Sequence, residues 1–319
     1  STIVNQAHAI TASRRRSIFA RLRGWGTFWS LLFILSLLFL SPPARAQDEP
    51  EEPDYAFVAG GPYTQQKNSL QLIAPGMVGW RTSGAGLNRR FSDAMLRIEW
   101  GFTSNIELDL EISATGLRER TAGTTLSSDF GLSDTVLGVR YRLLNEEDSP
   151  ITLALGPQII FPSGNILRGT GFDSFGFAWD ISAAKDWGGP FFVYTSLNYA
   201  VIPSVSLPGL AGDFTLNQLT HGSALGIRAL EKPSGEAHHD LHAFLEVGIE
   251  RGEEVTAAGL GAIKTSSLAA IFSPGIRYGF LSASKKLIEI GVAFPIGLND
   301  NAPRASIIFQ IQFEQFLNF

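Results

Sequence analysis

The stretch AMLRIEWGFTSNIELDLEIS, residues 94–113, decides the fold class. From 106 to 113 each apolar residue is followed by a polar one, and 94–100 alternate in nearly the same way. Successive side chains of a strand point to opposite faces, so both halves have one apolar and one polar face. The stretch therefore predicts a hairpin of two long strands. Such a hairpin suits a half-buried soluble sheet or the wall of a membrane barrel, apolar toward lipid and polar toward the lumen.

The first 46 residues have the pattern of a secretory signal peptide. Five arginines precede an apolar run over 27–40, and Ala44-Arg45-Ala46 forms a small-x-small cleavage signal before Gln47. The apolar run is shorter than the roughly 20 residues that a spanning helix needs, which argues against a transmembrane anchor. A twin-arginine signal is set aside because that route carries folded cargo, which a barrel would not be. We therefore predict a signal peptide over 1–46 and an exported mature chain.

Composition excludes several classes of function. The six arginines of the signal leave 19 basic and 30 acidic residues in 47–319, a net charge of −11, which argues against nucleic-acid binding. The chain has no cysteine, so disulfides, thiolate chemistry and a lipoprotein anchor are excluded. The remaining 273 residues are enough for one sizeable domain or one barrel.

Twelve segments of the mature chain alternate like strands, and helical periodicity is nearly absent. Short and long connections between them alternate in strict order, as in an outer-membrane barrel with short periplasmic turns and longer external loops. We therefore predict an all-β fold: an antiparallel transmembrane β-barrel of about 12 strands over 67–319, preceded by a periplasmic leader over 47–66. A soluble periplasmic β-domain is the alternative. The predicted strands are 69–81, 91–101, 104–116, 132–144, 150–161, 173–187, 190–202, 214–230, 239–251, 267–281, 285–297 and 303–319.

Two further features support the membrane interpretation: the aromatic residues at the ends of the predicted strands and the pattern of the last strand. Aromatic residues gather at both ends, as in the interfacial girdles of barrels. The last strand alternates over 307–314 and the chain stops at Phe319. A terminal alternating strand of this kind is typical of the signal that the barrel-insertion machinery of the outer membrane recognises. We expect that machinery and outer-membrane lipid as partners.

Several motifs resemble a known family. The residues are KNSLQL at 67–72, LRIEWGFT at 96–103 running into IEL, GLSDTVLGVRYRLL at 131–144 and FPSG at 161–164. They resemble the outer-membrane barrels named for the meta pathway of phenol degradation, best from 67 to 164. FPSG has Ser where Thr is more usual, and the His-rich segment near 238 has no counterpart. The resemblance implies a channel or uptake protein, often near pathways that degrade aromatic compounds, and no catalytic residues.

Charged side chains on the polar faces are the predicted pore lining. On neighbouring strands they place an acidic ladder between basic positions, so that charges can pair across the wall. One interpretation is a salt-bridged wall that stabilises or closes a narrow barrel; the other is a constriction whose transverse field selects polar or anionic solutes. The predicted set is Arg97, Glu99, Glu107, Asp109, Glu111, Arg140, Arg142, Asp180, Arg228, Glu246, Glu250, Arg277 and Glu289.

Two other constellations suggest an enzyme or a metal site. His221 and Ser223 share one predicted outward face and resemble the His-x-Ser pair of outer-membrane phospholipase A, although Ala224 stands where that pattern continues with Asn. His238, Asp240 and His242 share one face, but residues four apart on a strand lie about 13 Å apart, too far for one ion. No Gly-rich loop follows a strand and opens a helix, so nucleotide chemistry is unsupported.

The sequence therefore predicts a non-enzymatic outer-membrane channel for passive uptake or efflux of small solutes, with aromatic or apolar compounds as candidates. No cofactor, catalytic residue or metal ligand is predicted. The alternatives are a barrel-type lipid hydrolase using Ser223 and His221, and a closed structural barrel without transport.

Overall fold

The computed structural model describes residues 56–82, 87–121, 124–207, 212–234, 237–258, 261–282 and 286–316. The predicted signal peptide, the first part of the leader (47–55) and the last three residues lie outside this part of the chain. The elements are β1 (Ser69–Thr82), β2 (Leu87–Thr103), β3 (Ile106–Thr121), β4 (Thr124–Leu132), β5 (Thr135–Leu144), β6 (Thr152–Phe161), the 3₁₀ turn η1 (Ile166–Arg168), β7 (Gly176–Asp186), β8 (Phe191–Val205), β9 (Phe214–Ser234), β10 (Ala237–Ala258), β11 (Gly261–Leu281), β12 (Leu287–Ala293), β13 (Ile296–Gly297) and β14 (Ala305–Phe316).

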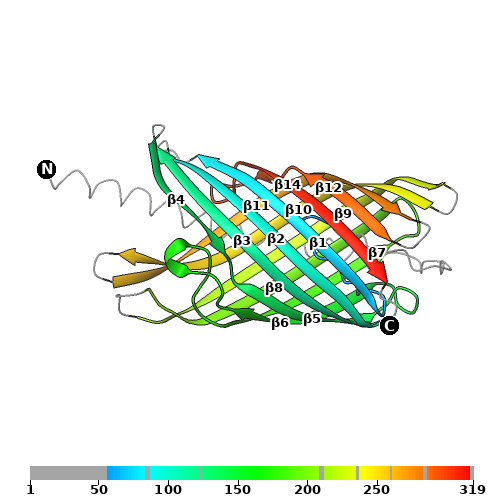
Figure 1. Ribbon diagram of the computed structural model, residues 1–319, viewed down its shortest axis with the longest axis horizontal. Coiled ribbons are helices and arrows are strands. Elements are labelled where there is room, and N and C mark those ends of the chain that lie inside the picture. The colour runs from blue at the N-terminus through cyan, green and yellow to red at the C-terminus, as the bar shows by residue number, and fades with distance from the viewer. Residues whose placement is uncertain are drawn as a thin grey trace, which may run out of the picture. The chain divides into compact units, whose positions relative to one another are not determined.

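The strands pair antiparallel in chain order and close into a twelve-stranded barrel (Figure 1). β4 and β5 together form one position of the wall, because both pair with β3, and β12 and β13 likewise share the position between β11 and β14. Twelve residue pairs, from Ser69↔Phe316 to Trp80↔Ala305, join β1 to β14. This pairing removes the free sheet edges that a membrane-embedded barrel cannot leave open.

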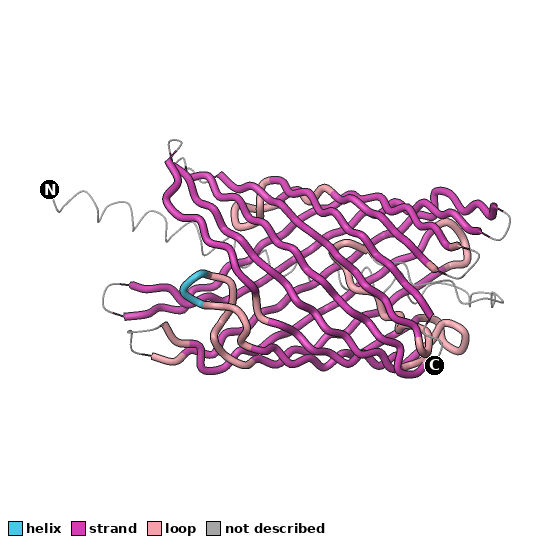
Figure 2. The backbone as a smooth tube through the Cα atoms, in the orientation of Figure 1, coloured by secondary structure: helices cyan, strands magenta, loops and turns pink. Residues whose placement is uncertain are grey.

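The wall is apolar outside and polar inside, as the alternation predicted. In β5, Val139 and Tyr141 are exposed on the outer face, whereas Arg140 between them is buried toward the lumen. In β14, Phe309 and Ile311 are exposed, and Gln310 between them is buried. The strands run obliquely around the barrel (Figure 2), which is the tilt that closing a sheet requires.

The strands are longer than the sequence predicted on the side of the long connections. Most of the expected loops 117–131 and 252–266 is strand: β3 continues to Thr121, β10 continues to Ala258 and β11 begins at Gly261. The expectation of loops there was wrong. It rested on the alternation of apolar residues, which is weak in these two stretches. Strand pairing needs backbone N–H and C=O groups, so hairpins of Ser, Thr, Glu and Arg extend the ladder past the apolar band.

A half-buried carboxylate joins one position of the wall to a neighbouring segment of the chain. Asp134 lies between β4 and β5, and its two oxygens accept the N–H groups of Gly164 (2.8 Å) and Phe172 (2.9 Å) in the segment that contains η1. These bonds hold that segment against the break in the wall. Within the described residues, no helix is long and apolar enough to cross a membrane.

Candidate functional site in the barrel lumen

The lumen contains a segment of the chain itself, residues 56–66, which precede β1. The carboxylate of Glu246 on β10 accepts three successive backbone N–H groups: Phe57 at 3.0 Å, Val58 at 2.7 Å and Ala59 at 3.0 Å. Glu246 has no exposed surface. A buried carboxylate is costly unless hydrogen bonds satisfy it, and three converging N–H groups do so. Glu246 is therefore the main anchor of this segment.

Other strands of the wall bind the rest of the segment. The Gly60 N–H donates to Ser196 Oγ on β8 at 2.9 Å, and the Gln65 N–H donates to Glu107 Oε2 on β3 at 2.6 Å. Thr64 Oγ1 donates to the Ser104 carbonyl oxygen at 2.9 Å. The segment, which we call the lumenal segment, is thus bound from several sides of the barrel.

The wall leaves room for the lumenal segment where it lacks side chains. A Cβ added to Gly222 would lie 2.7 Å from Ala59 Cα, and one added to Gly275 or Gly291 would lie 2.7 or 2.6 Å from the ring of Phe57. These distances are shorter than carbon atoms tolerate, so the glycines form a cradle for this particular stretch of chain.

Apolar packing supports the same arrangement. The rings of Phe57 and Phe244 meet edge to face with centroids 5.9 Å apart, and Tyr63 meets Tyr194 in the same way at 5.9 Å. Ala59 lies in the buried cluster that these residues form. Edge-to-face rings at this separation attract each other beyond their burial. The inside of the barrel therefore has a small hydrophobic core built partly from the lumenal segment.

The predicted charge ladder lies next to Gln65, near the end of the lumenal segment that leads into β1. Arg140 Nη1 is 2.7 Å from Glu107 Oε1, and its Nη2 is 3.7 Å from Asp109 Oδ2. Arg97 is ion-paired with Glu111, and its Nη1 is 3.6 Å from Glu99 Oε1. Charges on the three neighbouring strands pair across the wall, as the sequence indicated.

The other predicted lining residues fall into separate groups. Arg277 pairs with Glu289 (3.2 Å) and lies over the ring of Phe244, close to the anchor Glu246. Arg228 pairs with Asp186 (2.5 Å). Arg142 donates to the Ser104 carbonyl oxygen (2.7 Å), so it reaches the β2–β3 turn. Asp180 and Glu250 also lie on the inward face by the alternation of their strands.

The carboxylates of Glu99, Glu107 and Asp109 come close enough to hold a metal ion, with oxygens within 4.8 Å of one another. A guanidinium already occupies this position, because Arg140 contacts both Glu107 and Asp109. Gln65 Nε2 also donates to Glu99 Oε2 at 3.3 Å. The carboxylate oxygens of these three residues thus already bind Arg140 and the lumenal segment. They do not fit a resident cation.

The outward pair His221 and Ser223 forms a hydrogen-bonded chain with Thr195. Ser223 Oγ lies 3.1 Å from His221 Nε2 and 3.2 Å from Thr195 Oγ1, and His221 Nδ1 lies 3.0 Å from the Ser196 carbonyl oxygen. A nucleophilic serine needs a base that a third group orients. Here the third group is a backbone carbonyl, and the chain is equally explained as polar side chains that satisfy one another on an apolar face.

The His-rich segment of β10 makes contacts with aromatic residues on both faces of the wall. His242 packs edge to face against Phe192, with centroids 5.9 Å apart, near the core that contains Phe57. His239, which points outward, contacts Tyr278 instead. Among the described residues, the cluster capable of binding a metal does not include His238, Asp240 or His242.

Comparison with solved structures agrees with this architecture. An outer membrane channel from Pseudomonas putida F1 has a TM-score of 0.52 at 13% identity, over 83% of this chain and 99% of that one. The fold is that of an outer-membrane β-barrel. The β-domain of the Bordetella autotransporter BrkA has a TM-score of 0.49 at 11% identity, over 79% of this chain and 100% of that one. No family model matches the sequence, and no curated protein matches it. The similarity to the Pseudomonas channel is one of fold alone, and it transfers no residue's role.

The lumenal segment is what sequence reasoning missed. The sequence places 47–66 in a periplasmic leader, and the described part of it, 56–66, lies inside the barrel. A weak signal existed: Phe57 and Tyr63 are aromatic residues in a stretch that follows an acidic, proline-containing one. Aromatic residues of this kind more often pack than stay in solvent.

Proposed function

We propose that this chain is a passive outer-membrane channel for small solutes, and that the lumenal segment is its plug. The observation that carries the proposal is the way in which the lumen is filled. A closed structural barrel fills its interior with the side chains of the wall. In this barrel, wall glycines keep a cradle open, and a segment outside the strand ladder occupies it through hydrogen bonds to Glu246, Ser196 and Glu107.

The charges of the lumen define which solutes pass. The thirteen predicted lining residues comprise eight carboxylates and five guanidiniums. A narrow passage with excess negative charge concentrates cations and repels anions. We therefore propose neutral or cationic solutes rather than anionic ones. Uncharged aromatic compounds are the neutral class that the resemblance over 67–164 indicates.

Ion selectivity tests this proposal. The mature chain, 47–319, inserted in a planar bilayer under a salt gradient, should give a reversal potential of cationic sign. Asp109→Lys should move the reversal potential toward anions, and Arg140→Glu should move it further toward cations. Arg251→Glu, on the outer face of β10, is the matched control and should leave it unchanged. An anion-selective wild type would contradict the proposed solute class.

The alternatives make different predictions. A lipid hydrolase requires calcium-dependent lipase activity that Ser223→Ala abolishes, whereas a channel shows none and conducts equally after that substitution. A closed structural barrel inserts and is silent under every condition, with or without the plug. Insertion through the last strand, by the barrel-insertion machinery, is proposed for all three.

A further inference from the structure

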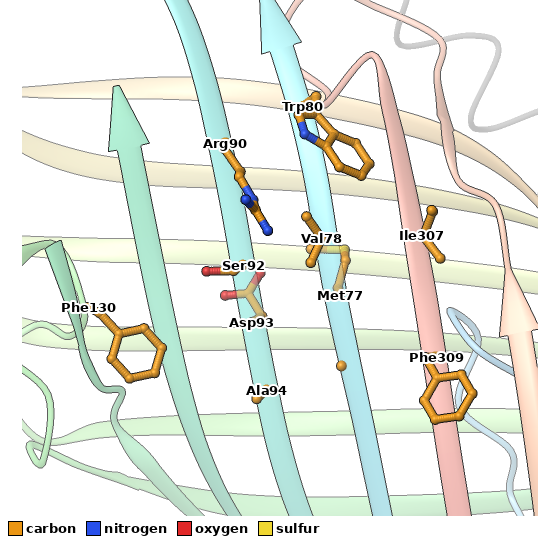
Figure 3. Close-up of a pocket in the computed structure, with 11 residues that line it drawn as sticks. Met77, Val78, Trp80, Arg90, Ser92, Asp93, Ala94, Phe130, Ile307 and Phe309 are labelled. Atoms are coloured by element: carbon orange, nitrogen blue, oxygen red, sulfur yellow. The ribbon is translucent and has the colours of Figure 1, made fainter. Parts of the chain in front are cut away.

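An apolar groove of about 500 Å³ lies on the outward face of β1, β2, β4 and β14 (Figure 3). Its floor is made of small residues, Gly76 and Ala94, which are directly paired across β1 and β2. Phe130, Phe309 and Trp80 stand around it, and Phe130 is 65% exposed. The groove faces the lipid side because most of its lining, including Trp80, Phe130 and Phe309, belongs to the outward face of each strand. Met77 and Asp93, which pair across β1 and β2 on the opposite face, complete the lining.

A cluster of guanidiniums stands at the end of the groove next to the longer hairpins. Arg90 lines the groove and is paired with Trp80 on β1 and with Arg118 on β3. Arg120 lies two residues beyond Arg118 on the same face. Like charges that face each other across two strands repel. We call Arg90, Arg118 and Arg120 the outer arginine cluster.

The outer arginine cluster has hydroxyl partners but no counter-charge in the described residues. Arg118 and Arg120 each donate to Thr125 Oγ1, at 3.4 and 3.2 Å. Among the ion pairs of the described chain, none involves a member of the cluster. Residues 83–86 and 122–123, which follow β1 and β3 in the sequence, contain no acid. By contrast Arg89, on the inner face of β2, is ion-paired with Glu119 at 2.5 Å. The cluster is therefore available to an external anion.

We propose that this face binds a phosphate-bearing, multi-acyl lipid of the outer leaflet. The guanidinium fork matches phosphate oxygens in pairs, and the groove below Arg90 accepts an alkyl chain along Val78 and Ile307. Trp80 beside Arg90 marks the level of the lipid headgroups, where tryptophan is enriched. Head and tail of one lipid thus meet complementary surfaces in the order in which they occur in the leaflet. The site does not depend on whether the lumen conducts.

Native mass spectrometry of the folded full chain with diphosphoryl lipid A tests the proposal. The double variant Arg90→Gln, Arg118→Gln should retain at least tenfold less lipid than the wild type. The control Arg251→Gln removes a single exposed guanidinium from the outer face of β10, and it should retain lipid as the wild type does. Ala94→Phe fills the groove without changing charge and should also lower retention. Heat-modifiable gel mobility confirms that each variant is folded.

The source of the phosphate is distinguished by two further probes. The wild type should retain dephosphorylated lipid A as poorly as the double variant retains diphosphoryl lipid A. Millimolar inorganic phosphate should not displace lipid that is bound to the wild type. Equal retention by the wild type and the double variant would overturn the proposal. So would displacement by inorganic phosphate, because the groove would then contribute nothing.

Discussion

At the scale of single residues, one carboxylate decides what the lumen contains. Glu246 is buried and its oxygens are used by three backbone N–H groups of the lumenal segment. Hydrogen bonds to a charged group contribute about 1.5–3 kcal/mol each. Their partners lie on a segment that no strand pairing holds, so their loss should free the segment and leave the barrel intact.

Glu246→Ala should expose the lumenal segment. The chain has no cysteine, so a single cysteine at Ala59 reports on it through its rate of maleimide labelling. Even the contribution of one of the three bonds, about 2 kcal/mol, corresponds to a roughly 30-fold faster reaction, so the rate should rise by at least that factor. Glu250→Ala, which removes an inward carboxylate four residues further along β10, should leave the rate unchanged. Equal labelling in both variants would show that Glu246 is not the anchor.

A second carboxylate, outside the membrane-spanning strands, makes stability depend on pH. Burial raises the pKa of Glu146, in the β5–β6 turn, from 4.5 to about 7, although the Asp186 N–H donates to it. The folded state therefore holds this proton more tightly than the unfolded state. Its contribution to stability is complete below about pH 4.5 and is lost as the pH rises through 7.

Urea unfolding of the barrel in detergent at pH 5 and pH 8 measures this contribution. The wild type should be less stable at pH 8, and Glu146→Gln, which keeps a neutral side chain, should reduce that difference. Glu147→Gln, at the exposed neighbouring position, serves as the control. If stability falls between pH 5 and pH 8 by as much in Glu146→Gln as in the wild type, Glu146 is not the source of the pH dependence.

At the scale of elements, the strands of the wall could be predicted from the sequence, whereas the lumenal segment inside the barrel could not. The strands, their order and their inward charges follow from a period of two residues and from the spacing of hairpins, which are local properties. The lumenal segment depends on contacts such as Phe57 to Glu246, which are 189 residues apart in the chain. A short stretch without alternation gives no local signal for such a contact. The glycines of the cradle were likewise visible in the sequence only as small residues that leave room.

The cradle can be tested by filling it. Gly291→Leu places a side chain where the ring of Phe57 lies, since even a Cβ would come within 2.6 Å of it. The lumenal segment should be displaced, and labelling at a cysteine in place of Ala59 should become as fast as in Glu246→Ala. Gly189→Leu is the matched control, because no atom lies within 4 Å of the added Cβ. Slow labelling in Gly291→Leu would mean that the segment does not need the cradle.

At the scale of the whole molecule, the barrel has two surfaces with separate chemistry. The inner one combines ion-paired side chains with a bound segment of the chain, and the outer one carries an arginine cluster next to an apolar groove. The closed ladder between them keeps the wall rigid, since every strand has two neighbours. A change in the lumen can therefore occur without opening the wall, which is what a plugged channel requires.

Single-channel conductance with and without the lumenal segment tests this account most directly. The mature chain, 47–319, and a truncated chain, 67–319, which keeps all twelve positions of the wall, are inserted separately in planar bilayers. We predict small or rare steps for the mature chain and larger, frequent ones for the truncated chain. Equal conductance of the two, or a truncated barrel that inserts and stays silent, would contradict a channel plugged by its own segment.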